Sequence, residues 1–357
     1  MRSTGIARGL ALTAGLATAG PAVAAEVEID GRLQVGYTYF HSSGQGHGGT
    51  IGDDKGQSRI GIAARQTIAG STAAIGRAEV GLDPDTFGND DDDSSNPFRA
   101  REAWVGIQGT AGQLRAGRLP GAYKQAGGIH WDLMNATELQ QRRAGGMTGG
   151  AYGNDGFINS LVEYRTHSLA GIELLVQYGF DDRSDDDVDR SGDDLLVGGI
   201  YREGPWELIG AYSRDDSLPA GENRNWKLGA RFDTGEASLA YQYEKVRVRD
   251  QVDDASVERD SGTLTLNPIT PDETFDFDTR HHMVGMSQTY GMRMLWLAWG
   301  YMDADDDDFD IYNYTIALNR LFSQGMRWYT GVQYQDRGRG YESRHLTVFT
   351  TGLRFDF

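Results

Sequence analysis

Three acidic runs give this chain its clearest capacity for chemistry, which is the binding of divalent cations. They are "NDDDD" at 89–93, "DDRSDDDVDRSGDD" at 181–194 and "DADDDDFD" at 303–310. Carboxylate oxygens are the hard ligands that Ca²⁺ and Mg²⁺ prefer. A Ca²⁺ or Mg²⁺ site in these runs therefore stays open, although we prefer the plainer interpretation that they are hydrated segments whose like charges repel one another.

The second run also imitates the start of a helix-loop-helix calcium site. Asp187, Asp189, Ser191 and Gly192 match its opening positions, but the twelfth position is Gly198 instead of glutamate. That glutamate normally supplies two of the ligand oxygens. A strand-like run follows where a helix is required, so the motif does not predict a calcium-binding hand.

Motifs typical of enzymes are missing from the sequence. No histidine pair has metalloprotease spacing, no glycine-rich loop precedes a phosphate-binding helix, and no serine lies in a nucleophile elbow. His281 and His282 are adjacent, so on a strand their rings point to opposite faces. Cysteine is absent, which excludes disulfides and thiolate metal sites. The sequence predicts neither an enzymatic activity nor a cofactor.

The first 25 residues have the features of a secretory signal peptide. Arg2 and Arg8 precede an apolar stretch from about Gly9 to Gly20, and small residues follow up to Ala25. Cleavage falls just before or after Ala25. It removes two of the 34 basic and none of the 52 acidic side chains, so the net charge changes from −18 to −20. An exported protein this acidic repels nucleic acid, which we exclude as a partner.

Residues 26–357 are expected to form one all-β domain. No segment there has the roughly 18 to 20 apolar residues of a membrane helix, but runs of about ten residues with period-two alternation recur, such as "GRLQVGYTYF" and "PWELIGAYSR". Each run places apolar residues on one strand face and polar residues on the other. We count about 16 such runs between Val27 and Phe357.

The connections between these runs alternate in length. Long ones such as "HSSGQGHGGTIGDDKGQ", "DPDTFGNDDDDSSNP" and "DDSLPAGENRN" alternate with short ones such as "AGST", "GTAG" and "REGP". All long connections then emerge at one end of the sheet, as in a transmembrane antiparallel β-barrel with short periplasmic turns and long extracellular loops. Closure removes the sheet edges that lipid cannot solvate. About 16 strands leave a water-filled lumen.

Several fragments in order carry a family resemblance. They are "AEVEIDGRLQVGYTYF", "SRIGI", "IGRAEVGLD", "REAWVGIQG" followed by "GQLRAGRLPG", and the ending "GLRFDF". Together they resemble the general bacterial porins of the Gram-negative outer membrane. The resemblance implies a homotrimer of 16-stranded barrels, each with its third loop folded into the lumen. The long stretch at about 119–157, whose middle "WDLMNATELQQRR" could form a short helix, matches such a constriction loop.

In such porins, arginines on the barrel wall face carboxylates across the narrowest point of the lumen. The charges orient dipolar solutes and penalise apolar ones. The resemblance assigns the basic wall to Arg32, Arg59, Arg77, Arg99, Arg101 and Arg118. These arginines are expected on the polar side of their runs, opposite apolar residues such as Ala78 and Trp104. It assigns the lining carboxylates to Glu79, Asp132 and Glu138. Because acidic loops surround a basic wall, the sequence leaves anion or cation selectivity open.

The apolar faces of the runs differ along the chain. Small and aliphatic residues without aromatics suggest a trimer interface at Ile60, Ile62, Ala64, Ala74, Gly76 and Ala78, whereas later runs carry ring side chains suited to lipid headgroups, including Trp206, Trp226, Trp296 and Trp328. The final run, with Phe355 and Phe357, is expected to close the barrel. It also resembles the signal that the outer-membrane barrel assembly machinery recognises.

The function expected from these features is passive diffusion of ions and small hydrophilic solutes through an outer-membrane channel. Two alternatives remain: a channel specific for one substrate, and a structural or adhesive barrel with a plugged lumen. Further partners implied by the location are outer-membrane lipids and lipopolysaccharide.

Overall fold

A computed structural model describes residues 25–44, 46–53, 58–82, 98–148, 156–180, 194–218, 221–251, 274–323, 325–341 and 343–357. The predicted signal peptide up to residue 24, the acidic run at 89–93 and nearly all of the run at 181–194 lie outside these residues. Within the described part, no helix is long and apolar enough to cross a membrane.

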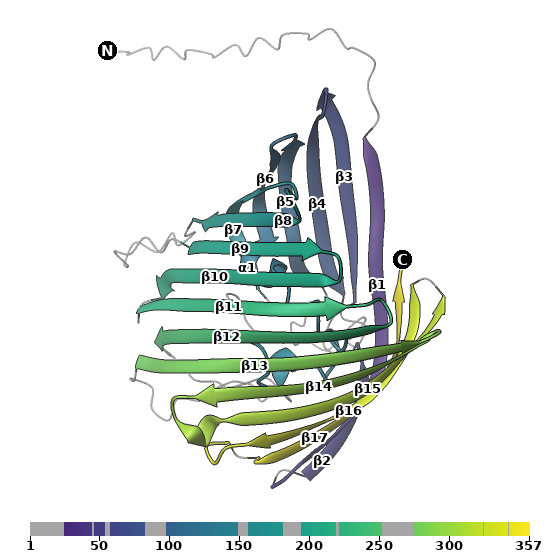
Figure 1. Cartoon of the computed structure of the whole chain (residues 1–357), viewed down its shortest axis with the longest axis vertical. Helices are drawn as coiled ribbons and strands as arrows, with labels where there is room; N and C mark the ends of the chain where they lie inside the picture. The colour runs from purple at the N-terminus through teal and green to yellow at the C-terminus, as the bar shows by residue number, and fades with distance from the viewer. Residues whose placement is uncertain are drawn as a thin grey trace, which may run out of the picture.

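The described residues form antiparallel strands that surround a few short helical turns (Figure 1). The strands are β1 (Glu26–Ser42), β2 (Gly46–Gly52), β3 (Arg59–Ala69), β4 (Thr72–Leu82), β5 (Phe98–Gly109), β6 (Gly112–Pro120), β7 (Phe157–Arg165), β8 (Ile172–Gly179), β9 (Asp194–Glu203), β10 (Trp206–Leu218), β11 (Gly221–Asp233), β12 (Ala237–Gln251), β13 (Thr274–Tyr290), β14 (Arg293–Ala304), β15 (Ile311–Ser323), β16 (Met326–Arg337) and β17 (His345–Asp356). The helical turns are α1 (Ala122–Gln125), η1 (Gln141–Arg143) and η2 (Asp307–Phe309).

These segments make a closed barrel of 16 strands, as the sequence predicts. Each strand pairs with the next, and β17 returns to pair with β1. β2 and β3 lie end to end along β1: β2 pairs with Gly36–Ser42 and β3 with Glu26–Arg32. The 17 described segments therefore correspond to 16 barrel strands, of which the second is interrupted between Gly52 and Arg59.

The seam between the first and last strands is completed by the chain terminus. Phe357 donates its backbone N–H to the Gly31 carbonyl at 3.1 Å, and Gly31 donates to the Phe357 carbonyl at 2.9 Å. The Phe357 ring lies where a side chain on Gly31 would stand, so the absence of a Cβ at Gly31 makes room for it. The terminal aromatic run is thus part of the wall.

The connections sort by length to the two ends of the barrel, here called the turn end and the loop end. At the turn end, the connections at 70–71, 110–111, 204–205 and 291–292 have two residues each. Gly70, Gly204 and Gly291 adopt positive φ angles of 54°, 57° and 59° there, a conformation that favours glycine in tight hairpins. At the loop end, the strands are separated by longer stretches of sequence, including 83–97, 121–156 and 252–273, of which the structure describes 121–148 and 156.

Two connections expected to be long loops are largely strand. β10 extends to Leu218 and β11 begins at Gly221, and the two strands stay paired in this part, for example between Asp215 and Asn223. β2 likewise forms a hairpin with β1. The alternation predicted loops here because the residues are polar on both strand faces. Backbone pairing nevertheless continues beyond the apolar band, where both faces of the sheet are in water. The resulting hairpins extend the barrel wall at the loop end.

Candidate functional site

The connection between β6 and β7 spans residues 121–156, and we call it the constriction loop. Its described part, 121–148, lies inside the barrel. Figure 1 shows α1, at its start, behind the strands of the front wall. Its apolar residues pack on the inner wall: Tyr123 and Trp131 lie in one buried cluster with Leu175, Leu196 and Met283, among other wall residues. Met134 and Leu139 lie in a second cluster with Trp296, Tyr329 and Val348. The third-loop arrangement expected from the sequence is therefore confirmed.

This packing corrects the assumption that the inner face is uniformly polar. Leu175, Leu196 and Met283 point inward, because the loop and not water covers them. Trp296, expected among the outward aromatics, also points inward and is 1% exposed. The signal was present in the sequence, since consecutive apolar pairs such as Leu174–Leu175 and Leu195–Leu196 break the alternation.

Glycines in the wall let the loop approach closely. A Cβ on Gly229 of β11 would meet the Trp131 ring at 2.5 Å, and one on Gly300 of β14 would lie 2.7 Å from Gly146 of the loop. Polar contacts also bind the loop: Asn313 donates to the Ala144 carbonyl at 2.7 Å and Gln333 to the Leu139 carbonyl at 2.9 Å. The loop is consequently fixed to the wall along much of its length.

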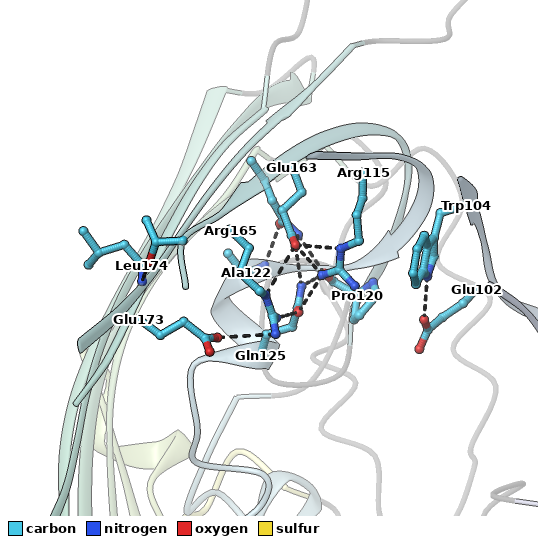
Figure 2. A network of polar contacts seen from close by, with 12 residues as sticks. Glu102, Trp104, Arg115, Pro120, Ala122, Gln125, Glu163, Arg165, Glu173 and Leu174 are labelled. Atoms are coloured by element: carbon cyan, nitrogen blue, oxygen red, sulfur yellow. Dashed lines mark hydrogen bonds and ion pairs between the residues drawn. The ribbon is translucent and has the colours of Figure 1, made fainter. Parts of the chain in front are cut away.

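The start of the loop is held by a network around Glu163 of β7 (Figure 2). The buried Glu163 carboxylate accepts hydrogen bonds from Arg115 Nε at 2.9 Å, Gln125 Nε2 at 2.8 Å and Gln177 Nε2 at 2.7 Å. Gln177 in turn accepts from the backbone N–H of Ala122 at 2.6 Å. Because Gln125 and Ala122 belong to α1, the network connects α1 to β6, β7 and β8.

A second carboxylate, Glu244 of β12, connects the two ends of the loop. It accepts a hydrogen bond of 3.0 Å from the Tyr123 hydroxyl and further hydrogen bonds from the backbone N–H, at 3.3 Å, and hydroxyl of Thr148. Lys227, opposite Glu244 on β11, places its ammonium 4.4 Å from the centre of the Tyr123 ring. Sequence reasoning missed this anchor, whose only signal is a pair of opposite charges at inward positions of neighbouring strands.

Asp132 was predicted to line the pore, but the structure places it inside the loop. Its side chain is 4% exposed and accepts backbone hydrogen bonds from Met134 at 3.0 Å and Gln141 at 2.6 Å. Burial raises its pKa to about 6 despite these hydrogen bonds. Its carboxylate therefore stabilises the loop conformation and faces no solute. Glu138, the other predicted loop carboxylate, is half-buried on the loop.

Three of the predicted wall arginines converge on Glu79 of β4, which was itself predicted to line the pore. Arg59 Nε of β3 lies 3.4 Å, Arg77 Nη2 of β4 2.7 Å and Arg101 Nε of β5 2.5 Å from its carboxylate oxygens. Arg77 also donates two hydrogen bonds, of 2.6 and 2.8 Å, to Asp30. We call Arg59, Arg77, Arg101 and Glu79 the arginine cluster.

The cluster faces the constriction loop across the lumen. The loop contacts described above run along the wall from β6 to β17, and the Ala136 carbonyl accepts a hydrogen bond from Gln34 of β1. The arginine cluster occupies the remaining arc, on β3 to β5. Lys124 of α1 comes near this arc, since its ammonium lies 3.7 Å and the Arg101 guanidinium 4.7 Å from the centre of the Phe157 ring. Lys124 and Phe157 were not predicted from the sequence.

The other predicted wall arginines lie apart from the cluster. Arg32 is opposite Arg59 in register, but its guanidinium turns to Asp356 at 2.7 Å. Arg99, with half of its side chain exposed, lies 3.8 Å from Asp53.

Arg118 corrects the prediction most clearly. Arg118 is opposite Ala103 of β5 in register. Ala103 shares the outer face with Val105, which is 71% exposed. The Arg118 guanidinium donates a hydrogen bond of 2.7 Å to Asn159. The register of β6 with β7 shifts between Gly117 and Leu119, but the extra residue lies on β7, so β6 keeps its alternation and Arg118 shares the outward face of Leu114 and Ala116. Arg118 therefore belongs to the outer surface.

A second irregularity, between β4 and β5, places Trp104 on the inner face of the barrel. The register between β4 and β5 shifts so that Glu79 is opposite Glu102 and Val80 opposite Ala100, which leaves Arg101 unpaired and turned inward. Trp104, expected on the apolar face, lies inside: its indole N–H donates to Glu102 at 3.0 Å and Arg115 stacks on its ring at 4.8 Å (Figure 2).

The predicted interface residues share one outer surface. Ile62 is opposite Ala78 and Ala64 opposite Gly76, with Ala74 one pair further on and Ile60 one pair before. Ile60 and Ile62 are 41% and 50% exposed.

The described residues contain no group of three or more side chains that could hold a metal ion. The third acidic run, at 303–310, belongs to the described residues.

Comparison with known proteins relates this architecture to channels. No protein with a curated description matches the chain in sequence. Among solved structures, the anion-selective porin from Comamonas acidovorans superposes with a TM-score of 0.74 at 18% identity, covering 94% of this chain and 100% of that one. OmpT of Vibrio cholerae in its trimer form gives 0.63 at 17% identity, with 94% and 100% covered.

A third structure, Salmonella typhi OmpF in complex with daunomycin, gives a TM-score of 0.66 at 15% identity, with 93% and 97% covered. At these identities the likeness establishes the fold. The family model described as Gram-negative porin matches residues 11–340, which is most of the chain. The chain therefore belongs to the Gram-negative porin family, and it forms an outer-membrane channel for passive diffusion.

Proposed function

We propose that the constriction of this porin prefers anions. The observation that carries the proposal is the shared carboxylate of the arginine cluster: Arg59 and Arg101 both reach Glu79. The other nearby carboxylates contact Arg77: Asp30 accepts two hydrogen bonds from it, and Glu102 lies 3.8 Å from it, so Arg59 and Arg101 share the carboxylate of Glu79. Lys124 adds a further positive charge above Phe157.

The acidic loop end works against this preference, because a chain with a formal charge of −18 attracts cations to the channel mouth. At physiological ionic strength, however, exposed charges are screened within about 8 Å. In the constriction, a permeating ion passes the guanidinium groups at close range and with little water between them. The short-range field of the constriction therefore outweighs that of the mouth. The Comamonas relative is itself described as anion-selective.

We further propose a homotrimer that forms through the outer surface of β3 to β6. Small side chains such as Gly76 and Ala78 permit close approach of another barrel. Arg118 lies on the same surface and donates a hydrogen bond to the neutral side chain of Asn159. An arginine that faces lipid costs free energy that depends on its depth, up to about 2–4 kcal/mol at the bilayer midplane, so a second subunit that covers this surface removes that cost.

The reversal potential of the purified protein in a planar bilayer under a KCl gradient tests the selectivity. A preference for Cl⁻ is expected, and it should fall when Arg59 and Arg101 are both replaced by glutamine. Arg202→Gln is the matched control, because Arg202 pairs with Glu207 near the turn end, away from the cluster. A preference for K⁺ in the unmodified channel would contradict the proposal.

A further inference from the structure

Two arginines lie directly opposite each other on the lipid-facing surface at the turn end. Arg293, the first residue of β14, is paired in register with Arg320 of β15. Both are exposed, and both share a face with outward apolar residues: Leu295 follows Arg293 at the next outward position, and Ile316 precedes Arg320 by four residues. Trp328 is opposite Arg320 on β16, and Phe322 lies 5.3 Å from its guanidinium.

This pairing is unfavourable without a counter-charge. Like charges directly opposite on neighbouring strands destabilise a sheet, and neither arginine makes an ion pair with any carboxylate among the described residues, whereas Arg280, on the same outer face nearer the loop end, reaches Asp303 at 2.7 Å. Rings such as Trp328 and Tyr290 are suited to the headgroup level of a bilayer. The two guanidinium groups therefore face the level at which lipid phosphates lie.

An apolar groove begins beside the arginine pair. It has a volume of about 420 Å³ on the outer surface of β11 to β14 and is lined by Phe232, Ala237, Leu239, Met286, Tyr290 and Leu295, among others. Tyr290 is opposite Arg293 in register, and Leu295 is two residues further along the same strand. The groove and the arginine pair are thus neighbouring parts of one surface, cationic at the turn end and apolar toward the middle of the wall.

We propose that this surface binds one anionic glycerophospholipid of the inner leaflet. Its phosphodiester lies between Arg293 and Arg320, where Arg supplies paired N–H donors to phosphate oxygens, and one acyl chain lies in the groove. An anionic headgroup is favoured over a zwitterionic one, because a headgroup ammonium would face two guanidinium groups. The site lies on the far part of the wall from the proposed subunit interface on β3 to β6, so a trimer leaves it open to lipid.

Native mass spectrometry of the detergent-purified protein tests this proposal. Phosphatidylglycerol and phosphatidylethanolamine with identical acyl chains are added separately, and glycerol 3-phosphate provides the headgroup without chains. The unmodified protein should retain phosphatidylglycerol preferentially. Each arginine near the membrane surface should strengthen the binding of an anionic lipid about fivefold. The double variant Arg293→Gln/Arg320→Gln should therefore bind phosphatidylglycerol roughly thirtyfold more weakly.

Two further variants separate the parts of the site. Ala237→Phe fills the groove and should weaken retention of phosphatidylglycerol although both arginines remain. Arg202→Gln removes one charge from the lumen side near the same end and should change nothing. All variants are first checked for the folded β-barrel by circular dichroism.

Three results would overturn the proposal. They are equal retention of phosphatidylglycerol by the double variant, an equal loss in Arg202→Gln, and binding of glycerol 3-phosphate as tight as that of the lipid, which would identify a site for free anions. Loss of the oligomer in the double variant would instead assign the surface to a second copy of the chain.

Discussion

The hydroxyl of Tyr123 donates a hydrogen bond of 3.0 Å to the carboxylate of Glu244, 121 residues further along the chain. Thr148 binds the same carboxylate, so one buried acid on β12 holds the start of the constriction loop and a point near its end. The loop that narrows the lumen is therefore attached at defined points, and the width of the channel depends on a few hydrogen bonds as well as on apolar packing.

Removing the Tyr123 hydroxyl should loosen the loop. A hydrogen bond to a charged acceptor is worth about 1.5–3 kcal/mol, so Tyr123→Phe should increase fluctuations of the open-channel current in single-channel recordings. The control is Tyr241→Phe, which makes the same change on the outer face, where the Tyr241 hydroxyl contacts His282. Equal current noise in both variants would mean that this hydrogen bond does not restrain the loop.

Replacing Glu163 should destabilise the whole barrel. Removing one partner of a buried ion pair costs about 3–5 kcal/mol, and here Arg115 would lose its carboxylate while Gln125 and Gln177 lost an acceptor. Glu163→Gln should therefore lower the temperature of unfolding followed by circular dichroism. Glu203→Gln, at an exposed site near the turn end, should leave this temperature nearly unchanged.

A bulky side chain in the proposed subunit interface should weaken the trimer. Ala78 is opposite Ile62 and Ala103 on the outer surface, so Ala78→Trp should prevent close approach of a second barrel. Size-exclusion chromatography with light scattering gives the mass of the assembly. Leu239→Trp, on the outer face of β12, is the control. A trimer unaffected by Ala78→Trp would place the interface elsewhere.

Deleting Phe357 should impair assembly more than conductance. The residue exchanges two backbone hydrogen bonds with Gly31, and its ring covers that glycine. Without it the seam loses its last pair, and a terminal aromatic proposed as a recognition signal for the assembly machinery is removed. Less folded protein should be recovered from outer membranes, while the channels that do form should keep their single-channel conductance. Unchanged recovery would contradict this prediction.

The period-two alternation was sufficient to predict the barrel, because lipid on one side and water on the other impose it on nearly every strand. The family resemblance together with the length of the stretch at about 119–157 indicated the constriction loop. Its contacts could not be predicted in the same way: Asp132 is buried because backbone N–H groups close around it, and Leu196 points inward because the loop covers it. Both depend on tertiary packing that the local pattern does not encode.

The wall arginines show a different limit of sequence reasoning. Arg59 and Arg77 follow the alternation and lie in the arginine cluster. Arg118 was assigned to the wall by resemblance, but it shares a strand face with Leu114 and Ala116, which are exposed on the outside. The alternation along β6 makes Arg115 the inward arginine of this strand, and the irregularity lies on β7, where the step from Ile158 to Leu161 is one residue longer than the step on β6.

If the arginine cluster sets the sign of the selectivity, neutralising its positive and its negative members should move the reversal potential in opposite directions. The reversal potential under a KCl gradient is measured for the unmodified channel, for Arg101→Gln and for Glu79→Gln. Arg101 and Glu79 are in direct contact, so both variants disturb the same place but change its charge in opposite directions. A shift toward cations is expected for Arg101→Gln and toward anions for Glu79→Gln, whereas shifts of the same sign, or none, would mean that the cluster does not set the selectivity.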